Sequence, residues 1–327
     1  MATVQSALGP IDTSDFGPTL VHEHIRICYP GDDLDPHNAW DRQANIDTGV
    51  ERMTRLAEHG VRTIVDPCPI DLARDPELMA EVARQSGMQI ICATGFYHED
   101  IGIPYYWRLR SAEQVAELYL HEIEHGIGET GIKPGCIKIA SFDPPGAYDR
   151  TVIKGAALAA AESGTTVISH CENSNGGDVQ QEILAGEGVD LARCLIGHQD
   201  QAADPQQLVA LAERGSFVGV DRVGYDVLAP DERRVELVMA MVEAGKGDQL
   251  CLSQDHMGCL CSPRMPFRLP EGMEEVADSL LAGLNERLHE RRDYLFTGLK
   301  PDLEKAGLDS ATFDSILTDN PRRLFGD

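Results

Sequence analysis

Short apolar segments alternate with longer amphipathic segments along most of this chain, and this alternation limits the possible folds more than any other feature of the sequence. The apolar segments are rich in valine and isoleucine and mostly lack a polar residue at every second position. Such segments are typical of strands that are buried on both faces of a parallel sheet. They are residues 19–24, 61–66, 88–94, 135–140, 165–170, 193–198, 215–221 and 248–255.

The segments between the apolar ones predict helices. In residues 112–125, Val115 and Leu118 are spaced to fall on one helical face. Ser111 stands before this segment and Gln114 follows three residues later, a pattern that resembles a capping box. The other predicted helices include 45–59, 76–85, 151–161, 205–214 and 232–243.

Strands and helices in this alternating order predict an α/β fold. Eight such units predict a (β/α)8 barrel, the TIM barrel, as a single domain over residues 1–327. An open, doubly wound sheet would show the same alternation. The positions of the polar residues favour the barrel, because a barrel brings the carboxyl ends of all its strands to one mouth.

Chemically active side chains lie at or near the carboxyl ends of the predicted strands: His22, His24, Lys138, His170, His198, Asp221 and Asp255. On a strand, His22 and His24 project from the same face, and Glu23 between them faces away. Taken singly, a histidine at a strand end is more often a hydrogen-bonded structural residue, and Asp255 alone could be a helix N-cap. Together at one mouth, the four histidines, Asp255 and Lys138 predict a metal centre.

Lys138 is unusual because it stands between Ile137 and Ile139 in an apolar strand, where an ammonium group is costly to bury. Burial and two nearby dications would both lower the pKa of this lysine. A neutral amine can combine with carbon dioxide to give a carbamate, an anion whose two oxygens can bridge two metals. From the residues alone, a buried ion pair between Lys138 and an aspartate is an equal alternative.

The charge balance argues against several classes of partner. The chain has 28 Lys and Arg against 54 Asp and Glu, a net charge of −26 at pH 7. Nucleic acids and anionic membrane surfaces require a basic face, so we expect neither as a partner. No apolar run reaches the roughly 18–20 residues of a membrane span, and residues 1–10 lack the pattern of a secretory signal. We therefore expect a cytoplasmic protein.

The nine cysteines are an odd number, and we interpret them as reduced and mostly buried thiols. Cys259 and Cys261 form a C-x-C pair, which is as typical of a loop with free thiols as of a metal site. A literal GxGxxG match at 126–131 follows a helical segment, so the strand–turn–helix context of a nucleotide site is missing.

Several segments resemble the phosphotriesterase family of the amidohydrolase superfamily, and within it the phosphotriesterase-like lactonases. In chain order they are GPIDTSDFGPTLVHEHI, GVRTIVDP, TGFY, GCIKIA, ISHCE, IGHQD, FVGVDRVGYDVL and NPRRLF. The resemblance implies a barrel with a binuclear metal centre at its mouth, and a homodimer. It also implies that a hydroxide bridging the two metals opens lactones (acyl-homoserine or related γ- and δ-lactones), with side activity on phosphotriesters.

The resemblance assigns roles to individual residues. His22, His24 and Asp255 would hold the more buried metal, His170 and His198 the more exposed one, and a carboxylated Lys138 would bridge the two. Tyr97, Arg222 and Asp255 would be catalytic, with Asp255 moving a proton, and Asp221 and Tyr225 would line the substrate pocket. We expect zinc as the metal, with cobalt, manganese or iron as alternatives, because all of them bind histidine and carboxylate.

The sequence departs from this family in segments that influence substrate choice. Residues CEN follow His170, Gln254 precedes Asp255, and the loop at about 256–290 is enlarged and charged, so we expect it to form an unusual lid. The alternative function is therefore a dedicated phosphotriesterase, a carboxylesterase or an N-acyl amidase on the same centre, and a non-catalytic metal-binding protein is another class. The acidic surface favours a small, neutral, ester-like substrate.

Overall fold

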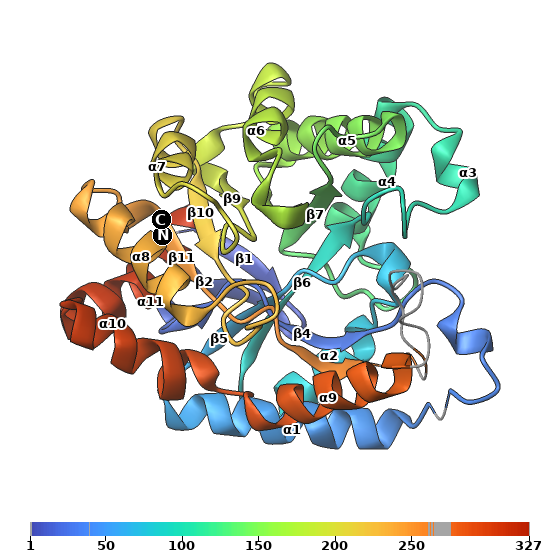
Figure 1. The fold of residues 1–327 in the computed structure, drawn as a ribbon. Helices are drawn as coiled ribbons and strands as arrows, with labels where there is room; N and C mark the ends of the chain where they lie inside the picture. Colours follow the sequence, from blue (N-terminus) through green and yellow to red (C-terminus); the bar gives the residue numbers. More distant parts are fainter. Residues whose placement is uncertain (1, 39, 261, 263, 265–275, 327) are drawn as a thin grey trace.

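The computed structural model describes residues 2–38, 40–260, 262, 264 and 276–326. Eight parallel strands form its central sheet, and most neighbours in the sheet are also neighbours along the chain (Figure 1). In sheet order they are β11 (Leu250–Leu252), β10 (Phe217–Val220), β9 (Cys194–Ile196), β8 (Thr166–Cys171), β7 (Cys136–Ser141), β6 (Gln89–Gly95), β5 (Thr63–Asp66) and β3 (Thr19–Leu20). The sheet curves into a nearly closed barrel surrounded by helices, which confirms the predicted (β/α)8 fold.

The two ends of this sheet, β3 and β11, are joined by hydrogen bonds at the mouth of the barrel. The Asp255 N–H donates to the His22 carbonyl (2.9 Å), and the His22 N–H donates to the Ser253 hydroxyl (3.0 Å). The Glu23 carboxylate accepts a hydrogen bond from the Gln254 N–H (2.7 Å) at the same junction, which we call the seam between β3 and β11. The first and last strands of the barrel are therefore connected in part through His22 and Asp255, two of the residues that were predicted to carry its chemistry.

The predicted strand 19–24 is divided into two strands. β3 ends at Leu20, and β4 (His24–Ile27) pairs in parallel with β12 (Met257–Leu260) in a separate two-stranded sheet. The division occurs because the His22 N–H bonds to a side chain instead of to a neighbouring strand. His22 itself therefore lies between two strands, although its side chain still points into the mouth.

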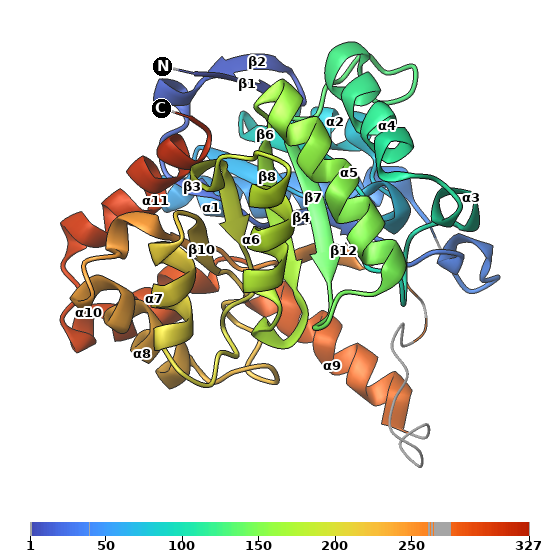
Figure 2. The ribbon, with the colours of Figure 1, turned by 90° about the horizontal axis from the view of Figure 1, so that it is seen from above.

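Helices cover the outside of the barrel, and α4 and α5 pack side by side (Figure 2). The longer helices are α1 (Arg42–Glu58), α2 (Pro76–Ser86), α4 (Ala112–His125), α5 (Ala147–Ser163), α6 (Gly177–Gly186), α7 (Gln206–Glu213), α8 (Asp231–Glu243), α9 (Ala277–Glu290) and α11 (Ser310–Leu324). The helices α3 (Tyr105–Arg108) and α10 (Lys300–Ala306) are short, and the hairpin of β1 (Thr3–Ser6) and β2 (Gly9–Asp12) precedes the barrel.

The helix predictions hold closely where a cap is clear in the sequence. α4 has the predicted bounds, and Ser111 and Gln114 form the predicted capping box. α5 begins four residues before the predicted start at 151. This earlier start follows from Asp149, whose carboxylate accepts the Gly146 N–H (3.2 Å) at the beginning of the helix.

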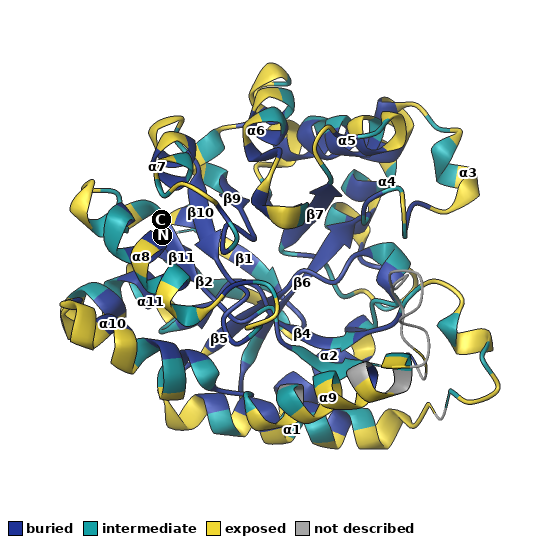
Figure 3. Cartoon of the chain, in the orientation of Figure 1, coloured by how far each residue is buried: buried dark blue, intermediate teal, exposed yellow. Residues whose placement is uncertain are grey.

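The strands at the centre of the barrel are buried along their whole length (Figure 3). Every residue of β7 and β8 is buried, including Lys138, which is 2% exposed. The described cysteines are all free, and seven of them are buried, while Cys259 is partly exposed in β12. Among the described residues, no helix is both long enough and apolar enough to cross a bilayer.

The loop after β11, which we expect to be enlarged, begins with β12 and ends with α9. Between them, the predicted lid residues 265–275 and Cys261 lie outside the described residues. α9 contacts β12, so the two described ends of the loop lie together beside the mouth.

Candidate metal centre

Three imidazoles meet the carboxylate of Asp255 at the mouth of the barrel. Asp255 Oδ1 lies 3.3 Å from His24 Nε2 and 3.6 Å from His22 Nε2, and Oδ2 lies 3.6 Å from His198 Nε2. The rings of His22 and His198 are stacked, with centroids 4.6 Å apart. The structure therefore brings these four predicted ligands into one group, although the two histidines of the 22–24 segment and Asp255 come from opposite ends of the barrel sheet and His198 follows the interior strand β9.

Lys138 reaches the same group from β7. Its Nζ lies 2.9 Å from His22 Nε2, and among the described residues no carboxylate lies within 4.0 Å of this nitrogen. Burial lowers the pKa of Lys138 to about 8, with Asp255 and Asp221 opposing the shift. About a tenth of such amines are neutral at pH 7. This is the form that reacts with carbon dioxide, whereas the alternative ion pair with an aspartate is not formed here.

His170 completes the group of histidines from the end of β8. Its ring centroid lies 4.4 Å from that of His198. Its Nε2 lies 2.7 Å from Glu172 Oε2 and 3.3 Å from the Tyr97 hydroxyl. Burial raises the pKa of Tyr97 well above its usual value of 10, so this hydroxyl stays protonated and available as a hydrogen-bond donor.

Each of the three imidazoles around Asp255 has a buried carboxylate on its other ring nitrogen. Asp221 contacts Nδ1 of His22 (3.1 Å) and of His198 (2.7 Å), and Asp66 contacts Nδ1 of His24 (3.0 Å). A carboxylate in this position holds the proton on Nδ1 and leaves the Nε2 lone pair free. The Nε2 atoms of all three rings therefore face Asp255, and they can ligate a metal once His24 has lost its second proton.

The position of Asp221 corrects the expectation that it lines the substrate pocket. Its side chain is fully buried beneath the imidazoles, and its backbone N–H donates to Asp200 (3.1 Å), which fixes the inward direction. The next residue, Arg222, faces the mouth instead, with its Nε 3.1 Å from Asp255 Oδ2. The Tyr225 hydroxyl donates to the Asp255 carbonyl (2.9 Å) and so supports the backbone of that residue.

Two residues of the centre have strained backbones. His198 and Asp255 have φ angles of 59° and 47°, in the left-handed region that disfavours side chains with a Cβ. Such conformations cost about 1–3 kcal/mol each and concentrate at functional sites. Here the hydrogen bonds from Asp255 N–H to His22 and from His198 N–H to Asp221 (2.8 Å) hold them in place.

The donor atoms of this centre fit divalent metals. His198 Nε2 is buried and has no hydrogen-bond partner within the part of the chain that the structure describes, a cost that a metal would remove. Burial, assisted by Lys138, lowers the pKa of His22 to about 3, and burial also lowers that of His170 well below 6.5. Both imidazoles are therefore neutral, as ligation requires.

His24 differs in its charge when no metal is bound. Burial lowers its pKa, but hydrogen bonds to Asp255 and Asp66 outweigh burial and raise it well above 6.5. A metal at this position must therefore displace a proton from His24, which makes metal affinity fall at low pH.

Two acidic residues of this site were not predicted from the sequence. Asp66 is the last residue of β5, and Glu172 lies two residues after His170. Both lie at or directly after the end of a strand, as the histidines do. The same criterion, applied to every acidic residue, would therefore have identified them.

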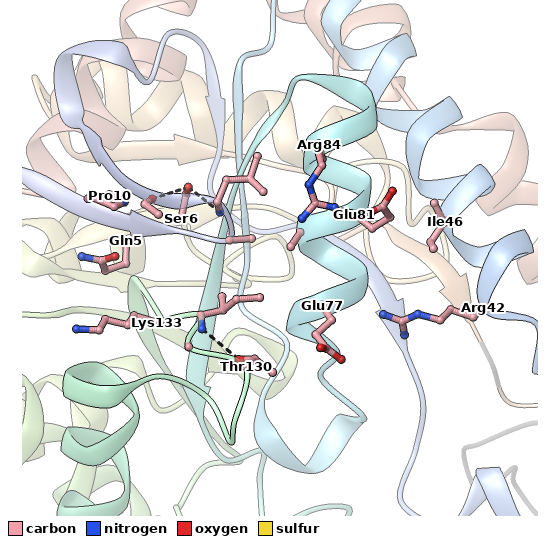
Figure 4. A pocket seen from close by; sticks show the side chains of 16 residues that line it. Gln5, Ser6, Pro10, Arg42, Ile46, Glu77, Glu81, Arg84, Thr130 and Lys133 are labelled. Atoms are coloured by element: carbon pink, nitrogen blue, oxygen red, sulfur yellow. Dashed lines mark hydrogen bonds and ion pairs between the residues drawn. The ribbon is translucent and has the colours of Figure 1, made fainter.

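A large surface cavity lies elsewhere on the molecule. It has a volume of 1040 Å³ and runs along α2, between the β1–β2 hairpin and residues 130–133 (Figure 4). None of its 16 lining residues belongs to the predicted metal or substrate set. The charged side chains there include Arg84 and Glu81, which pair with each other on the helix surface. Cavity volume alone therefore does not mark the candidate site.

Comparison with known proteins agrees with this geometry. A model of the phosphotriesterase family matches residues 2–325. The chain belongs to the phosphotriesterase family. Proteins of this family use a binuclear divalent metal centre, so this family member is a metal-dependent hydrolase.

Relatives of this family member differ in the activities that their names give. A phosphotriesterase homology protein of Mycobacterium tuberculosis is 34% identical, covering 99% of this chain and 98% of the relative. An aryldialkylphosphatase of Saccharolobus solfataricus is 31% identical, covering 96% of each chain. The solved organophosphorus hydrolase of Deinococcus radiodurans has a TM-score of 0.87 at 31% identity, covering 99% of this chain and 97% of that one. The family also includes N-acetyltaurine hydrolase.

Proposed function

We propose that this phosphotriesterase-family protein opens lactones, acyl-homoserine or related γ- and δ-lactones, with weaker activity on phosphotriesters. One arrangement carries the proposal: two hydrogen-bond donors, the Tyr97 hydroxyl and the Arg222 guanidinium, stand at the open side of the centre. A planar, compact lactone carbonyl fits between such donors, whereas a phosphotriester needs room for three substituents around phosphorus. A solved relative described as engineered from a weak promiscuous lactonase template, with a TM-score of 0.88 at 30% identity, supports the same choice.

The residues of the centre divide into ligands and proton carriers. His22, His24 and Asp255 would hold one metal, His170 and His198 the other, and Lys138 as a carbamate would hold both. When bound, two divalent metals lower the pKa of a water molecule and polarise the carbonyl under attack.

Asp255 is placed to carry the proton of the attacking water. Burial raises its pKa, but His198, His22, His24 and Arg222 outweigh burial and hold the pKa well below the usual value. The carboxylate is therefore ionised before attack and accepts the proton as the new carbon–oxygen bond forms. As the ring carbon–oxygen bond breaks, Asp255 returns the proton to the departing alkoxide, which gives a hydroxy acid.

Tyr97 and Arg222 would assist the reaction in two different ways. The protonated Tyr97 hydroxyl donates a hydrogen bond to the oxygen that gains negative charge in the transition state. Arg222 keeps Asp255 in orientation through its 3.1 Å contact. One such contact can supply the roughly 1.4 kcal/mol of differential binding that makes a tenfold preference between substrates.

A substrate panel tests the proposal. Protein reconstituted with zinc, cobalt or manganese is assayed on γ-lactones and δ-lactones of varied chain length, aryl esters, N-acyl amides and paraoxon. We expect kcat/KM for the best lactone to exceed that for paraoxon by at least about tenfold. If paraoxon, an aryl ester or an amide is clearly the best substrate, the lactonase assignment is wrong and that class replaces it. Full metal occupancy without turnover across the panel would instead indicate a metal-binding protein.

A further inference from the structure

His170 differs from the other three histidines of the centre in the ring nitrogen that its acidic partner contacts. The aspartates behind the other three contact Nδ1, whereas Glu172 Oε2 lies 2.7 Å from Nε2 of His170. A neutral imidazole carries one N–H, and the carboxylate that accepts its hydrogen bond fixes which nitrogen carries it. His170 is therefore left with Nδ1 as the nitrogen that has a free lone pair.

Glu172 also differs from those aspartates in exposure. The side chains of Asp66 and Asp221 are fully buried, whereas that of Glu172 is 21% exposed on the open side of the centre. Arg222 lies between the two carboxylates of the mouth, with NH1 4.0 Å from Glu172 Oε1 and Nε 3.1 Å from Asp255 Oδ2. This guanidinium limits the positions that the Glu172 carboxylate can take.

The backbone after Glu172 fixes its place relative to two histidines. Asn173 and Ser174 have φ angles of 55° and 59°, so the chain turns sharply in a conformation that is unfavourable for residues with a Cβ. The Ser174 hydroxyl donates to the His198 carbonyl (2.5 Å) and accepts the Gln201 N–H (2.9 Å). The turn that carries Glu172 is thereby tied to the segment that carries His198.

We propose that Glu172 is a positioning residue, which holds the Nε2 proton of His170 and so directs the Nδ1 lone pair toward the more exposed metal. This inference rests on the proposed function to the extent that it requires the two-metal centre, but not on the lactone substrate. Loss of a carboxylate that accepts a hydrogen bond from a metal-ligating histidine typically lowers metal affinity by about 10–100-fold.

A competing interpretation is that Glu172 ligates a cation directly. Glu172, His98 and His170 offer ligand atoms that lie within 4.8 Å of one another, and His98 is itself buried. The two interpretations differ in what glutamine does at position 172. The amide oxygen of glutamine accepts the same hydrogen bond from His170 Nε2, but a neutral amide is a poor substitute for a carboxylate ligand.

Cobalt(II) titration separates the two interpretations. Metal-free wild-type protein, Glu172→Gln and Glu172→Ala are titrated with cobalt against a competing chelator, and the visible absorbance of bound cobalt is recorded. Glu182→Gln is the matched control, because Glu182 lies on α6 with its side chain 66% exposed. We expect wild type and control to bind two cobalt ions. Glu172→Ala should lower the affinity for one cobalt ion by about 10–100-fold and change the affinity for the other by less than about threefold. Glu172→Gln should keep both affinities within about threefold of the wild-type values.

Unchanged affinity for both ions in Glu172→Ala would overturn the inference. A loss in Glu172→Gln as large as that in Glu172→Ala would also overturn it, in favour of direct ligation. A wild-type protein that binds no cobalt would remove the metal centre of the proposed function as well, so the two failures are distinguishable. Circular dichroism checks folding, and Glu172→Asp, whose shorter side chain withdraws the carboxylate, replaces the alanine variant if that variant does not fold.

Discussion

The carboxylate of Asp221 supports two imidazoles at once, so its conversion to an amide should disturb them unequally. In Asp221→Asn one oxygen remains, and it is best used toward His198, whose Nδ1–H (2.7 Å) and backbone N–H (2.8 Å) both donate to the same Asp221 oxygen. The new NH₂ group then faces the Nδ1–H of His22, where a donor now meets a donor. His22 must lose this hydrogen bond or move its proton to Nε2, the nitrogen needed for a metal.

The size of the effect follows from this asymmetry. An outer partner of a ligating histidine typically contributes 10–100-fold in metal affinity, which is about 1.4–2.8 kcal/mol. We therefore expect the more buried metal, assigned to His22, to bind about 10–100-fold more weakly. The metal assigned to His198 should change by less than about fivefold, because both hydrogen bonds from that residue are kept.

Chelator competition with zinc and with cobalt on metal-free Asp221→Asn measures both affinities. Asp47→Asn is the matched control, since Asp47 is an exposed residue of α1 whose carboxylate accepts a hydrogen bond from Gln43. Thermal unfolding of both variants shows whether the buried amide has changed the fold. A folded Asp221→Asn protein whose two metal affinities both match wild type within about threefold would refute the tautomer argument.

Three further predictions concern single residues. Lys138→Ala should lose most activity and regain part of it in acetate, because a free carboxylate can supply the missing anionic bridge. Asp255→Asn, assayed at saturating metal, should lower kcat by about 10²–10⁴-fold with a smaller change in KM, because its proton transfer acts in the transition state. Burial raises the pKa of Asp149 to about 6. A pKa above the unfolded value near 3.9 favours the folded state at low pH, and this contribution is lost as the pH rises through about 6. The free energy of unfolding of Asp149→Asn, measured in urea and compared with that of wild type, should therefore increase by about 1 kcal/mol as the pH rises from 5 to 8.

Each of these predictions has a clear contrary result. Unchanged metal content and rate in Lys138→Met would make the lysine purely structural. Near-normal turnover in fully loaded Asp255→Asn would remove Asp255 from the proton path. A stability difference between Asp149→Asn and wild type that does not vary with pH would show that this carboxyl is ionised in the folded state as it is in the unfolded chain.

The barrel could be predicted because its signal is repeated along the chain. Each buried strand is a separate apolar segment, so an error at one boundary leaves the count and order intact. The errors lie where a polar contact interrupts a strand. The predicted strand 193–198 shortens to β9, because His198 adopts a left-handed φ of 59° to reach Asp221. No local pattern in the sequence indicates that contact.

Most members of the candidate site were predictable from the sequence, but the sequence did not indicate which of them face the mouth and which lie beneath the histidines. The strand-end rule places His22, His170 and Asp255 at one mouth, whatever the twist of each strand. It does not say which of the adjacent residues Asp221 and Arg222 faces inward, and the family resemblance assigned Asp221 to the substrate pocket, although Asp221 lies beneath the histidines. That choice depends on Asp200, which holds the Asp221 N–H from a neighbouring loop.

The seam between β3 and β11 gives the protein a particular order of assembly during synthesis. His22 and Glu23 are synthesised before their partners Ser253 and Gln254, which are each 231 residues further along the chain. Contacts of such long sequence separation form late, because the entropy of closing a long loop must first be overcome. A nascent chain therefore exposes the edge of the first barrel strand until the segment that carries Ser253 and Gln254 has also been made. Asp255 arrives with the same segment, so tight metal capture would report that the barrel has closed.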